Sequence, residues 1–360
     1  MPKVALLSAG GTGGHLFPAQ ALGNELISRG WEVHLATDTR ASHFLAGFEG
    51  IEVHEIRSAT PSVRSPVKAL KAMFSLARGT FGSRRIIQRI RPSVFVGFGG
   101  YPSTPPGVAA ALSKVPIVLH EANATPGRAN RFLARFASAY ARSLPGPAFG
   151  KNAIDVETGN PVRQAVLDVK RPYTPLTTSD KLNLLVFGGS QGAQVFSQLL
   201  PDALTLMDPQ ERARIALTLQ VRSDDRAVCE KQLNELNVFA DLAPFFADLP
   251  ERIANAHFII GRAGASTVSE LAVLGRPALL VPYPHALDHD QAANADVLAK
   301  AGSATVVVQA ELTPEVLAAR LSELLNNPDQ LSSMADAAAA IGRPEATQHL
   351  ADLVVKIAKP

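Results

Sequence analysis

The sequence predicts an α/β protein with two doubly wound parallel-sheet domains, and three observations support this fold class. The chain has 360 residues, of which 46% are hydrophobic, so it can bury two cores. Short apolar runs alternate with segments of helical periodicity, which is typical of parallel sheets covered by helices on both faces. Each half also opens with an apolar run that leads into a glycine turn, at Gly10–Gly14 and at Gly188–Gly192.

The first half begins with a strand, a glycine turn and a helix. Apolar residues recur at helical spacing from Leu16 to Ile27, and Gly30 is expected to end that helix. Further short apolar runs predict the other strands. The strands expected in this half are Lys3–Ser8, Glu32–Ala36, Ile51–Ile56, Val94–Val96 and Pro116–Leu119.

The second half repeats this order. We place the N-terminal domain at residues 1–161 and the C-terminal domain at residues 162–343. Apolar residues at helical spacing after Pro344 predict an amphipathic helix over residues 344–360, which we expect to pack back on the first domain. One large mixed sheet is the alternative, which the chain length disfavours. The strands expected here are Leu182–Phe187, Ile215–Val221, His257–Ile260, Ala278–Val281 and Ala304–Val308.

Composition excludes several classes of protein. A single cysteine, Cys229, rules out a disulfide framework and a cysteine-based zinc site. No run of 18 apolar residues occurs, so no membrane-spanning helix is expected. The N-terminal residues are typical of a first strand rather than a signal peptide, which makes the cytoplasm the default compartment.

Charge is distributed unevenly along the chain. Residues 56–120 contain no Asp or Glu but ten Lys and Arg, a local charge of +10 within a net charge of +3. The rest of the chain therefore carries about −7 (3 − 10). This asymmetry predicts an anionic partner for the N-terminal half.

The first glycine turn is a candidate ligand site. Glycine lets the backbone approach a ligand closely, and a helix N-terminus favours negative charge. His15 follows the glycines directly, where a helix start lowers the pKa of an imidazole and keeps it neutral as a candidate base. Neither the dinucleotide fingerprint nor a P-loop is present, so a tight turn without a ligand is the alternative.

Other predicted strands of the first half also end in glycine or polar residues. Gly97–Ser103 forms a second glycine turn, and Glu121 and Asn123 follow the next strand. Because the carboxyl ends of parallel strands meet at one edge, we expect these residues to line one crevice. Helix capping and turn formation are the alternative for Glu121 and Asn123.

The second half offers groups that suit a nucleotide diphosphate. Ser190, Ser266 and Thr267 could donate to phosphate oxygens, and Glu270 could accept hydrogen bonds from a ribose. A capping box with Thr267 is the alternative for Glu270. Arg163 could pair with a diphosphate, or be a solvated surface arginine.

The segment after the Ala278–Val281 strand could bind a sugar or a metal. Gln291 and Asn294 suit neutral hydrogen bonds to sugar hydroxyls. A metal site at Asp288 and Asp290 is a less favoured interpretation.

Seven motifs occur in order and at characteristic spacings: GGTGGH, GFGGY, HEAN, GNPVR, GGSQGA, GRAGASTVSE and DQAANA. The chain resembles glycosyltransferase family 28 over nearly its whole length. The resemblance implies the GT-B fold, in which two Rossmann-like domains face a cleft. It implies an inverting enzyme of cell-wall synthesis, needed for cell shape and division. That enzyme moves GlcNAc from UDP-GlcNAc to the 4-hydroxyl of MurNAc in undecaprenyl-pyrophosphoryl-MurNAc-pentapeptide (lipid I), giving lipid II.

The resemblance also assigns site residues. Glu270 would hold the ribose, the Phe246 backbone would face uracil, and Gln291 would contact GlcNAc hydroxyls. The expected UDP-GlcNAc-binding residues are Thr12, Gly13, Gly14, Asn123, Arg163, Ser190, Phe246, Ala265, Ser266, Thr267, Val268, Ser269, Glu270 and Gln291.

The expected reaction is one in-line displacement. His15 is the candidate base that removes the acceptor proton, and Glu121 is the alternative. We expect no metal and no cofactor, because helix N-termini and Arg163 can carry the diphosphate charge.

A lipid-linked acceptor also gives the basic window a role. The segment Val67–Leu76 mixes cations with apolar residues, as interfacial helices do. The alternative is a helix packed on its own domain with a solvated basic face. We expect a peripheral protein at the cytoplasmic face of the inner membrane, with UDP-GlcNAc, the lipid acceptor and the anionic membrane surface as partners. The membrane-association candidates are Lys68, Lys71, Met73, Phe74 and Leu76.

Other functions fit the sequence less well. A UDP-GlcNAc 2-epimerase has the same two-domain architecture but does not need the basic apolar segment. A non-catalytic UDP-sugar-binding scaffold does not need a full donor site. The missing G-x-G-x-x-G disfavours a nicotinamide-dependent oxidoreductase, and nucleic-acid binding leaves the paired glycine loops unexplained, so no nucleic acid is expected as a partner.

Overall fold

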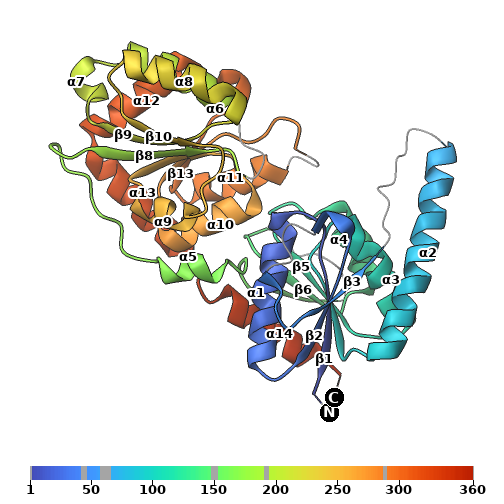
Figure 1. The fold of residues 1–360 in the computed structure, drawn as a ribbon. Coiled ribbons are helices and arrows are strands. Elements are labelled where there is room, and N and C mark those ends of the chain that lie inside the picture. The colour runs from blue at the N-terminus through green and yellow to red at the C-terminus, as the bar shows by residue number, and fades with distance from the viewer. Residues whose placement is uncertain are drawn as a thin grey trace. The chain divides into compact units, whose positions relative to one another are not determined.

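The computed structural model describes residues 2–41, 47–56, 66–146, 153–189, 194–286 and 290–359, with only the backbone described over residues 66–73. The chain divides into two compact units, Met1–Arg163 with Pro344–Pro360 (unit 1) and Gln164–Arg343 (unit 2). Each unit contains its own parallel sheet (Figure 1). One continuous mixed sheet, the alternative weighed from the sequence, is therefore wrong.

Unit 1 is built on a sheet that has, within the described residues, seven strands in the order β3-β2-β1-β4-β5-β6-β7. All neighbouring strands are parallel. The chain winds outward from β1 to β3 and then returns to β4, so the winding reverses between β1 and β4. The strands are β1 (Val4–Ser8), β2 (Glu32–Thr37), β3 (Glu52–Glu55), β4 (Val94–Gly97), β5 (Ile117–Glu121), β6 (Ala139–Arg142) and β7 (Ile154–Glu157).

Helices cover both faces of this sheet (Figure 1). On one face α1 packs against α14, and on the other α2 packs against α3. Successive strand residues point to opposite faces, so Leu7 and Leu35 join the core under α1 and α14, whereas Leu6 and Ala36 join the core under α2 and α3. The helices are α1 (Gly13–Ser28), α2 (Pro66–Ile90), α3 (Thr104–Leu112), α4 (Arg128–Leu133) and α14 (Ala346–Ile357).

Unit 2 repeats this architecture with the strand order β10-β9-β8-β11-β12-β13, again with parallel neighbours. Here the winding reverses between β8 and β11. The strands are β8 (Leu182–Phe187), β9 (Ile215–Gln220), β10 (Ala240–Ala243), β11 (Phe258–Gly261), β12 (Ala278–Leu280) and β13 (Ala304–Val306).

The helices of unit 2 also lie on both faces of its sheet. Helices α6 and α12 pack together on one face and α10 and α13 on the other (Figure 1). The helices are α5 (Gln164–Asp168), α6 (Gln194–Leu206), α7 (Pro209–Arg212), α8 (Ser223–Glu235), α9 (Leu249–Asn255), α10 (Ala265–Leu274), α11 (Asp290–Lys300), α12 (Pro314–Asn326) and α13 (Pro328–Ile341).

The expected fold class is confirmed, and every expected strand is present within a few residues of its predicted bounds. The sequence did not predict β6, β7 and β10. Each has four residues and includes Asp, Glu or Arg, so none forms a continuous apolar run.

Candidate active site

Two glycine turns meet at the carboxyl edge of the unit 1 sheet. Gly10 follows β1, and Gly99 and Gly100 follow β4 with φ of 88° and 75°, values that side chains other than glycine rarely adopt. The Gly10 N–H donates to the Gly99 carbonyl at 3.1 Å, and a Cβ on Gly10 would lie 3.1 Å from Gly100 Cα. This is where the winding reverses, the position at which open parallel sheets bind ligands.

His15 lies against this double turn. A Cβ on Gly99 would lie 3.3 Å from both Cδ2 and Nε2 of the ring, so glycine leaves the space that the imidazole occupies. Thr12 Oγ1 lies 3.0 Å from His15 Nδ1. The pKa of His15 is lowered to about 4, first by burial and then by the positive charge of Arg40. The ring is therefore neutral at neutral pH, although the main cause is burial rather than the helix terminus named by the sequence argument.

Glu121, the other candidate base, is committed to its own loop. It ends β5 and is 6% exposed. Its Oε1 accepts from the backbone N–H of Asn123 at 3.1 Å and from Asn123 Nδ2 at 3.4 Å. Its Oε2 accepts from the Gly127 N–H at 3.0 Å and from Asn130 Nδ2 at 2.8 Å. Burial raises the pKa of Glu121, and these hydrogen bonds oppose that rise. The carboxylate fixes residues 122–127, in line with the turn-forming alternative for Glu121 and Asn123.

Buried polar residues behind this loop were missed by the sequence analysis. Asn130 Nδ2 also donates to the His120 carbonyl at 2.9 Å, and the Tyr140 hydroxyl donates to the Asn130 carbonyl at 3.2 Å. His120 is fully buried, with Nε2 3.0 Å from Ser143 Oγ, and burial lowers its pKa to about 3. Only the position of His120 in the HEAN motif could have drawn attention to this network.

Arg163 is brought to the first glycine turn through Phe17. The Arg163 guanidinium carbon lies 5.0 Å from the centre of the Phe17 ring. The same ring packs so closely on Gly13 that a Cβ there would lie 2.9 Å from Phe17 Cε2. Arg163 is therefore stacked on the start of α1, rather than being the solvated surface arginine that was the alternative.

In unit 2, α10 begins directly after the turn that follows β11. Its N-cap is Gly264, and the helix has no side-chain cap. The capping-box interpretation of Thr267 and Glu270 is therefore wrong, since Glu270 lies inside the helix and is buried. The predicted donor segment, Ala265 to Glu270, forms the first turns of α10, whose first N–H groups lack partners within the helix. Ser266 Oγ is buried there with no hydrogen-bond partner among the described residues.

The start of α11 is tied to the loops around it. Gln291 Oε1 accepts from the Tyr283 N–H at 3.0 Å. Asn294 is fully buried and donates through Nδ2 to the Ala263 carbonyl at 3.1 Å, so it supports the turn before α10 instead of presenting its amide to a sugar. Arg262, which the sequence analysis missed, donates to the Val281 carbonyl at 3.0 Å. Asp288 lies outside the described residues, so the Asp288–Asp290 metal interpretation stays untested.

Gln220 joins the second glycine turn to the segment that leads to Phe246. Its Nε2 donates to the carbonyls of Gly189 and Pro244, both at 3.0 Å, and its Oε1 accepts from the Gly188 N–H at 3.0 Å. Phe246 is buried, and the Arg252 guanidinium carbon lies 4.2 Å from its ring centre. Ser190 lies outside the described residues. Gln220 ends β9 without any motif around it, so no sequence signal singled it out.

Helix α2 presents an exposed aromatic and basic face. Phe74 and Phe81 are 70% and 58% exposed, and the Arg85 guanidinium carbon lies 4.5 Å from the Phe81 ring centre. Phe74, Phe81 and Arg85 are spaced by seven and four residues, which places them on one side of the helix. Leu76 is only partly exposed. The side chains of the other membrane candidates, Lys68, Lys71 and Met73, lie outside the described part of the chain. Among described residues, no helix has both the length and the apolarity to cross a bilayer.

Comparison with known proteins identifies the family. Residues 5–141 match the glycosyltransferase family 28 N-terminal domain, and residues 183–350 match the family's C-terminal domain. The chain is 53% identical, over 99% of its length and 94% of theirs, to proteins from Brucella canis and Brucella abortus, each named UDP-N-acetylglucosamine--N-acetylmuramyl-(pentapeptide) pyrophosphoryl-undecaprenol N-acetylglucosamine transferase.

Solved structures agree with this match. The crystal structure of Acinetobacter baumannii MurG is similar with a TM-score of 0.82 and 30% identity, covering 99% of this chain and 100% of that one. A UDP-GlcNAc 2-epimerase from Neisseria meningitidis shares the fold, with a TM-score of 0.67 and 12% identity over 98% of this chain and 100% of that one. The chain is a member of glycosyltransferase family 28, with the GT-B architecture expected from its sequence.

Proposed function

We propose that this enzyme transfers GlcNAc from UDP-GlcNAc to the 4-hydroxyl of MurNAc in undecaprenyl-pyrophosphoryl-MurNAc-pentapeptide, the step that converts lipid I to lipid II in peptidoglycan synthesis. The observation that carries the proposal is the 53% identity to transferases of that name over 99% of the chain. The glycine turns of both units and the neutral His15 provide chemistry that suits it.

The donor diphosphate binds at the start of α10. The backbone N–H groups of the first turn and Ser266 Oγ, which has no partner in the described part of the chain, are hydrogen-bond donors, and the helix dipole adds partial positive charge there. Glu270 accepts from the ribose hydroxyls, and Gln291 contacts the sugar. In unit 1, the donor contacts that we propose are Arg163, Thr12, Gly13 and Gly14. These groups stabilise the charge that develops on UDP as it leaves. The other proposed donor contacts are Asn123, Ser190, Phe246, Ala265, Thr267, Val268 and Ser269.

His15 is the base in this proposal. With Nδ1–H donated to Thr12 Oγ1, the lone pair is on Nε2, the atom beside Gly99. As the bond from C1 of GlcNAc to UDP breaks, the acceptor oxygen bonds to C1 from the opposite side, and its proton passes to His15 Nε2. Glu121 is a weaker candidate, because both of its oxygens already accept hydrogen bonds from its own loop.

The acceptor is reached at a membrane surface. We place the protein peripherally on the cytoplasmic face, with the exposed face of α2 against anionic lipid. Phe74 and Phe81 supply apolar contacts, and the acid-free window of residues 56–120 supplies positive charge. Lys68, Lys71, Met73 and Leu76 belong to the same proposed surface.

Product analysis tests the reaction. The purified chain is incubated with labelled UDP-GlcNAc, with and without a short-chain lipid I analogue, and products are resolved by mass. Disaccharide lipid and UDP are expected only when the acceptor is present. ManNAc formed without acceptor would point to the epimerase instead, and tight UDP-GlcNAc binding without turnover would point to the scaffold.

Two pairs of variants test the assigned roles. Thr12→Val removes the hydroxyl that orients His15 and is expected to lower kcat, whereas Thr12→Ser keeps that hydroxyl and is expected to restore it. Phe74→Ser with Phe81→Ser is expected to reduce sedimentation with anionic vesicles. Phe239→Ser is the matched control, because Phe239 is 88% exposed in unit 2. Equal vesicle binding by both would contradict the membrane surface on α2.

A further inference from the structure

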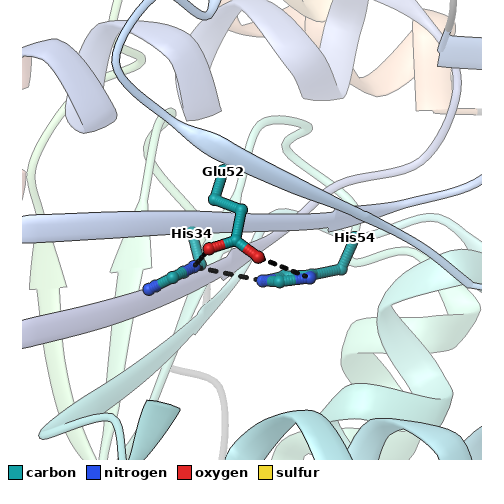
Figure 2. Close-up of side chains that lie close together, drawn as sticks. All are labelled: His34, Glu52 and His54. Atoms are coloured by element: carbon teal, nitrogen blue, oxygen red, sulfur yellow. Dashed lines mark hydrogen bonds and ion pairs between the residues drawn. The ribbon is translucent and has the colours of Figure 1, made fainter. Parts of the chain in front are cut away.

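A cluster of two histidines and a glutamate lies in β2 and β3, at the lateral edge of the unit 1 sheet. His34 lies in β2, and Glu52 and His54 lie in the neighbouring strand β3. His34 and His54 are 2% and 8% exposed, and their rings stack with centres 5.2 Å apart. Figure 2 shows the Glu52 carboxylate reaching both rings. None of these residues has a place in the proposed GlcNAc transfer.

The register of the two strands creates this cluster. The tripeptide Glu-Val-His occurs twice, at residues 32–34 in β2 and at residues 52–54 in β3. The strands pair with an offset of two residues, so His34 lies opposite Glu52 and Ala36 lies opposite His54. Side chains alternate between the faces of a sheet, so Glu32, His34, Glu52 and His54 all point to the face covered by α2. An odd offset would have separated them.

The ligand atoms are spaced as a metal ion requires. His34 Nδ1 and His54 Nε2 are 3.1 Å apart, and Glu52 Oε2 lies 3.5 Å from His34 Nδ1. One ligand atom from each residue lies within 4.8 Å of those from the other two. Two ligands at about 2.1 Å from a tetrahedral ion lie roughly 3.3–3.5 Å apart. We propose that His34, Glu52 and His54 bind one divalent transition-metal ion of the zinc class.

The surroundings of His34 are those of a metal ligand. His34 Nε2 lies 2.8 Å from Glu32 Oε1, so the N–H on Nε2 donates to that carboxylate and the lone pair on Nδ1 faces His54. A ligating histidine commonly donates its second ring N–H to a carboxylate in this way, which fixes the tautomer and strengthens the ligand. Two imidazoles and a carboxylate suit zinc and its neighbours rather than magnesium or calcium.

The metal ion would take the place of the proton between His34 Nδ1 and His54 Nε2, and that proton would stay on the His54 ring. Without metal, His54 Nε2–H donates to His34 Nδ1, and Arg89 Nη2 lies 3.5 Å from His54 Nδ1. When the ion binds both facing nitrogens, the His54 proton moves from Nε2 to Nδ1, where Glu52 Oε1 lies 3.7 Å away. Arg89 Nη2 stays on Glu52 Oε1 at 2.9 Å and holds that oxygen in place. Because Glu52 is exposed, water supplies the fourth ligand.

The site would join an edge strand to its neighbour. In the described sheet β3 pairs only with β2, so an ion held by both strands adds a crosslink where the sheet ends. The three ligands point to the face of the sheet that α2 covers, where Arg89 of α2 lies beside His54, whereas His15 belongs to α1 on the other face. The ion is therefore structural and takes no part in the transfer reaction.

Binding of Co²⁺ to the full-length chain, without a histidine tag and after chelator treatment, tests the site. We expect one equivalent of Co²⁺ to give the intense visible absorption of four-coordinate cobalt, and Zn²⁺ to displace it. Glu52→Gln, His34→Gln and His54→Gln are expected to abolish that absorption. Glu32→Gln is expected to weaken binding by about 10–100-fold. His349→Gln, an exposed histidine of the same unit, is the matched control and should bind as the unchanged chain does.

Two results would overturn the site. One is a chain that binds no stoichiometric Co²⁺ or Zn²⁺ beyond the level of the His34→Gln/His54→Gln variant. The other is undiminished binding by Glu52→Gln, whose exposed side chain can be changed without disturbing the core. A rise in the Tm of unit 1 with Zn²⁺ that is absent in Glu52→Gln would support the site. Transfer activity is measured separately on the chelator-treated chain. Because the ion takes no part in the reaction, activity should persist there, so a failure of the metal site and a failure of the proposed reaction can be told apart.

Discussion

Replacing Glu121 separates the two roles that a buried carboxylate beside a candidate site could have. If Glu121 organises the loop, Glu121→Ala removes the acceptor of the Asn123 N–H, of the Gly127 N–H and of one of the two N–H groups of Asn130 Nδ2. These lie 3.1, 3.0 and 2.8 Å from the carboxylate. A buried donor left unpaired costs about 1–3 kcal/mol, and water entering the vacated space recovers part of that cost. We expect the free energy of unfolding of unit 1 to fall by about 3–5 kcal/mol.

The single tryptophan makes this loss measurable in one unit. Trp31 packs against the core of unit 1, and the chain has no other tryptophan, so its fluorescence during urea unfolding reports that unit. The expected loss is a large share of the roughly 5–15 kcal/mol that stabilises a typical domain. Glu121→Gln keeps the shape but turns an amide NH₂ toward other donors, so a smaller loss of about 1–3 kcal/mol is expected. Glu49→Ala, an exposed glutamate of the same unit, controls for lost charge.

The opposite outcome would refute the assignment. The free energy of unfolding of Glu121→Ala could stay within about 1 kcal/mol of that of the unchanged chain while kcat falls by orders of magnitude. In that case the carboxylate acts on the substrate. Glu121 would then replace His15 as the base. A fall in stability with kcat restored at low temperature, where the loop stays folded, would support the organising role.

Three further predictions use the same probes. Gly99→Ala places a methyl group 3.3 Å from the His15 ring at a φ of 88°, so kcat should fall about 10–100-fold in a steady-state assay with KM little changed. The folded pKa of His120, about 3, lies below its unfolded value of 6.5, so stability is lost as pH falls below 6.5. Between pH 6.5 and pH 5, His120 should contribute about 1.6 kcal/mol to the loss of stability in urea unfolding, and His120→Gln should remove that contribution. Leu350→Ala should lower the free energy of unfolding of unit 1, measured by Trp31 fluorescence, by about 2–5 kcal/mol, because α14 is part of the unit 1 core.

The fold was largely predictable because its central strands consist of nearly continuous runs of apolar residues. Val4–Ser8 and Leu182–Phe187 are buried by helices on both faces, so nearly all of their residues are apolar. The missed strands β7 and β10 are edge strands of their sheets, and the missed strand β6 lies next to β7. Strands at the edge of a sheet, or next to it, tolerate charged residues such as Arg142 and Asp155, which pair with each other at 2.5 Å and interrupt the apolar pattern.

The candidate site was predictable only where its parts are local in sequence. The turn of Gly10–Gly14 and the position of His15 could be read directly. The contact of His15 with Gly99 depends on β1 lying beside β4, which no local spacing encodes. Gln220 acts by hydrogen-bonding backbone groups that only folding brings to it. The donor-site assignments, including Phe246 and Gln291, stay predictions until substrate binding is measured.

The return of α14 to unit 1 has a consequence for synthesis on the ribosome. Leu350, Ala351, Leu353 and Val354 complete a buried core whose other members lie in residues 5–141. Residues 164–343 must be translated in between, which takes on the order of ten to forty seconds at about 5–20 residues per second. During that interval α14 is absent, so the apolar residues of α1 and of the sheet that it covers stay exposed. We expect the unit to need chaperone shielding until its last helix emerges, and a premature stop codon in α14 to cause aggregation rather than a shortened enzyme.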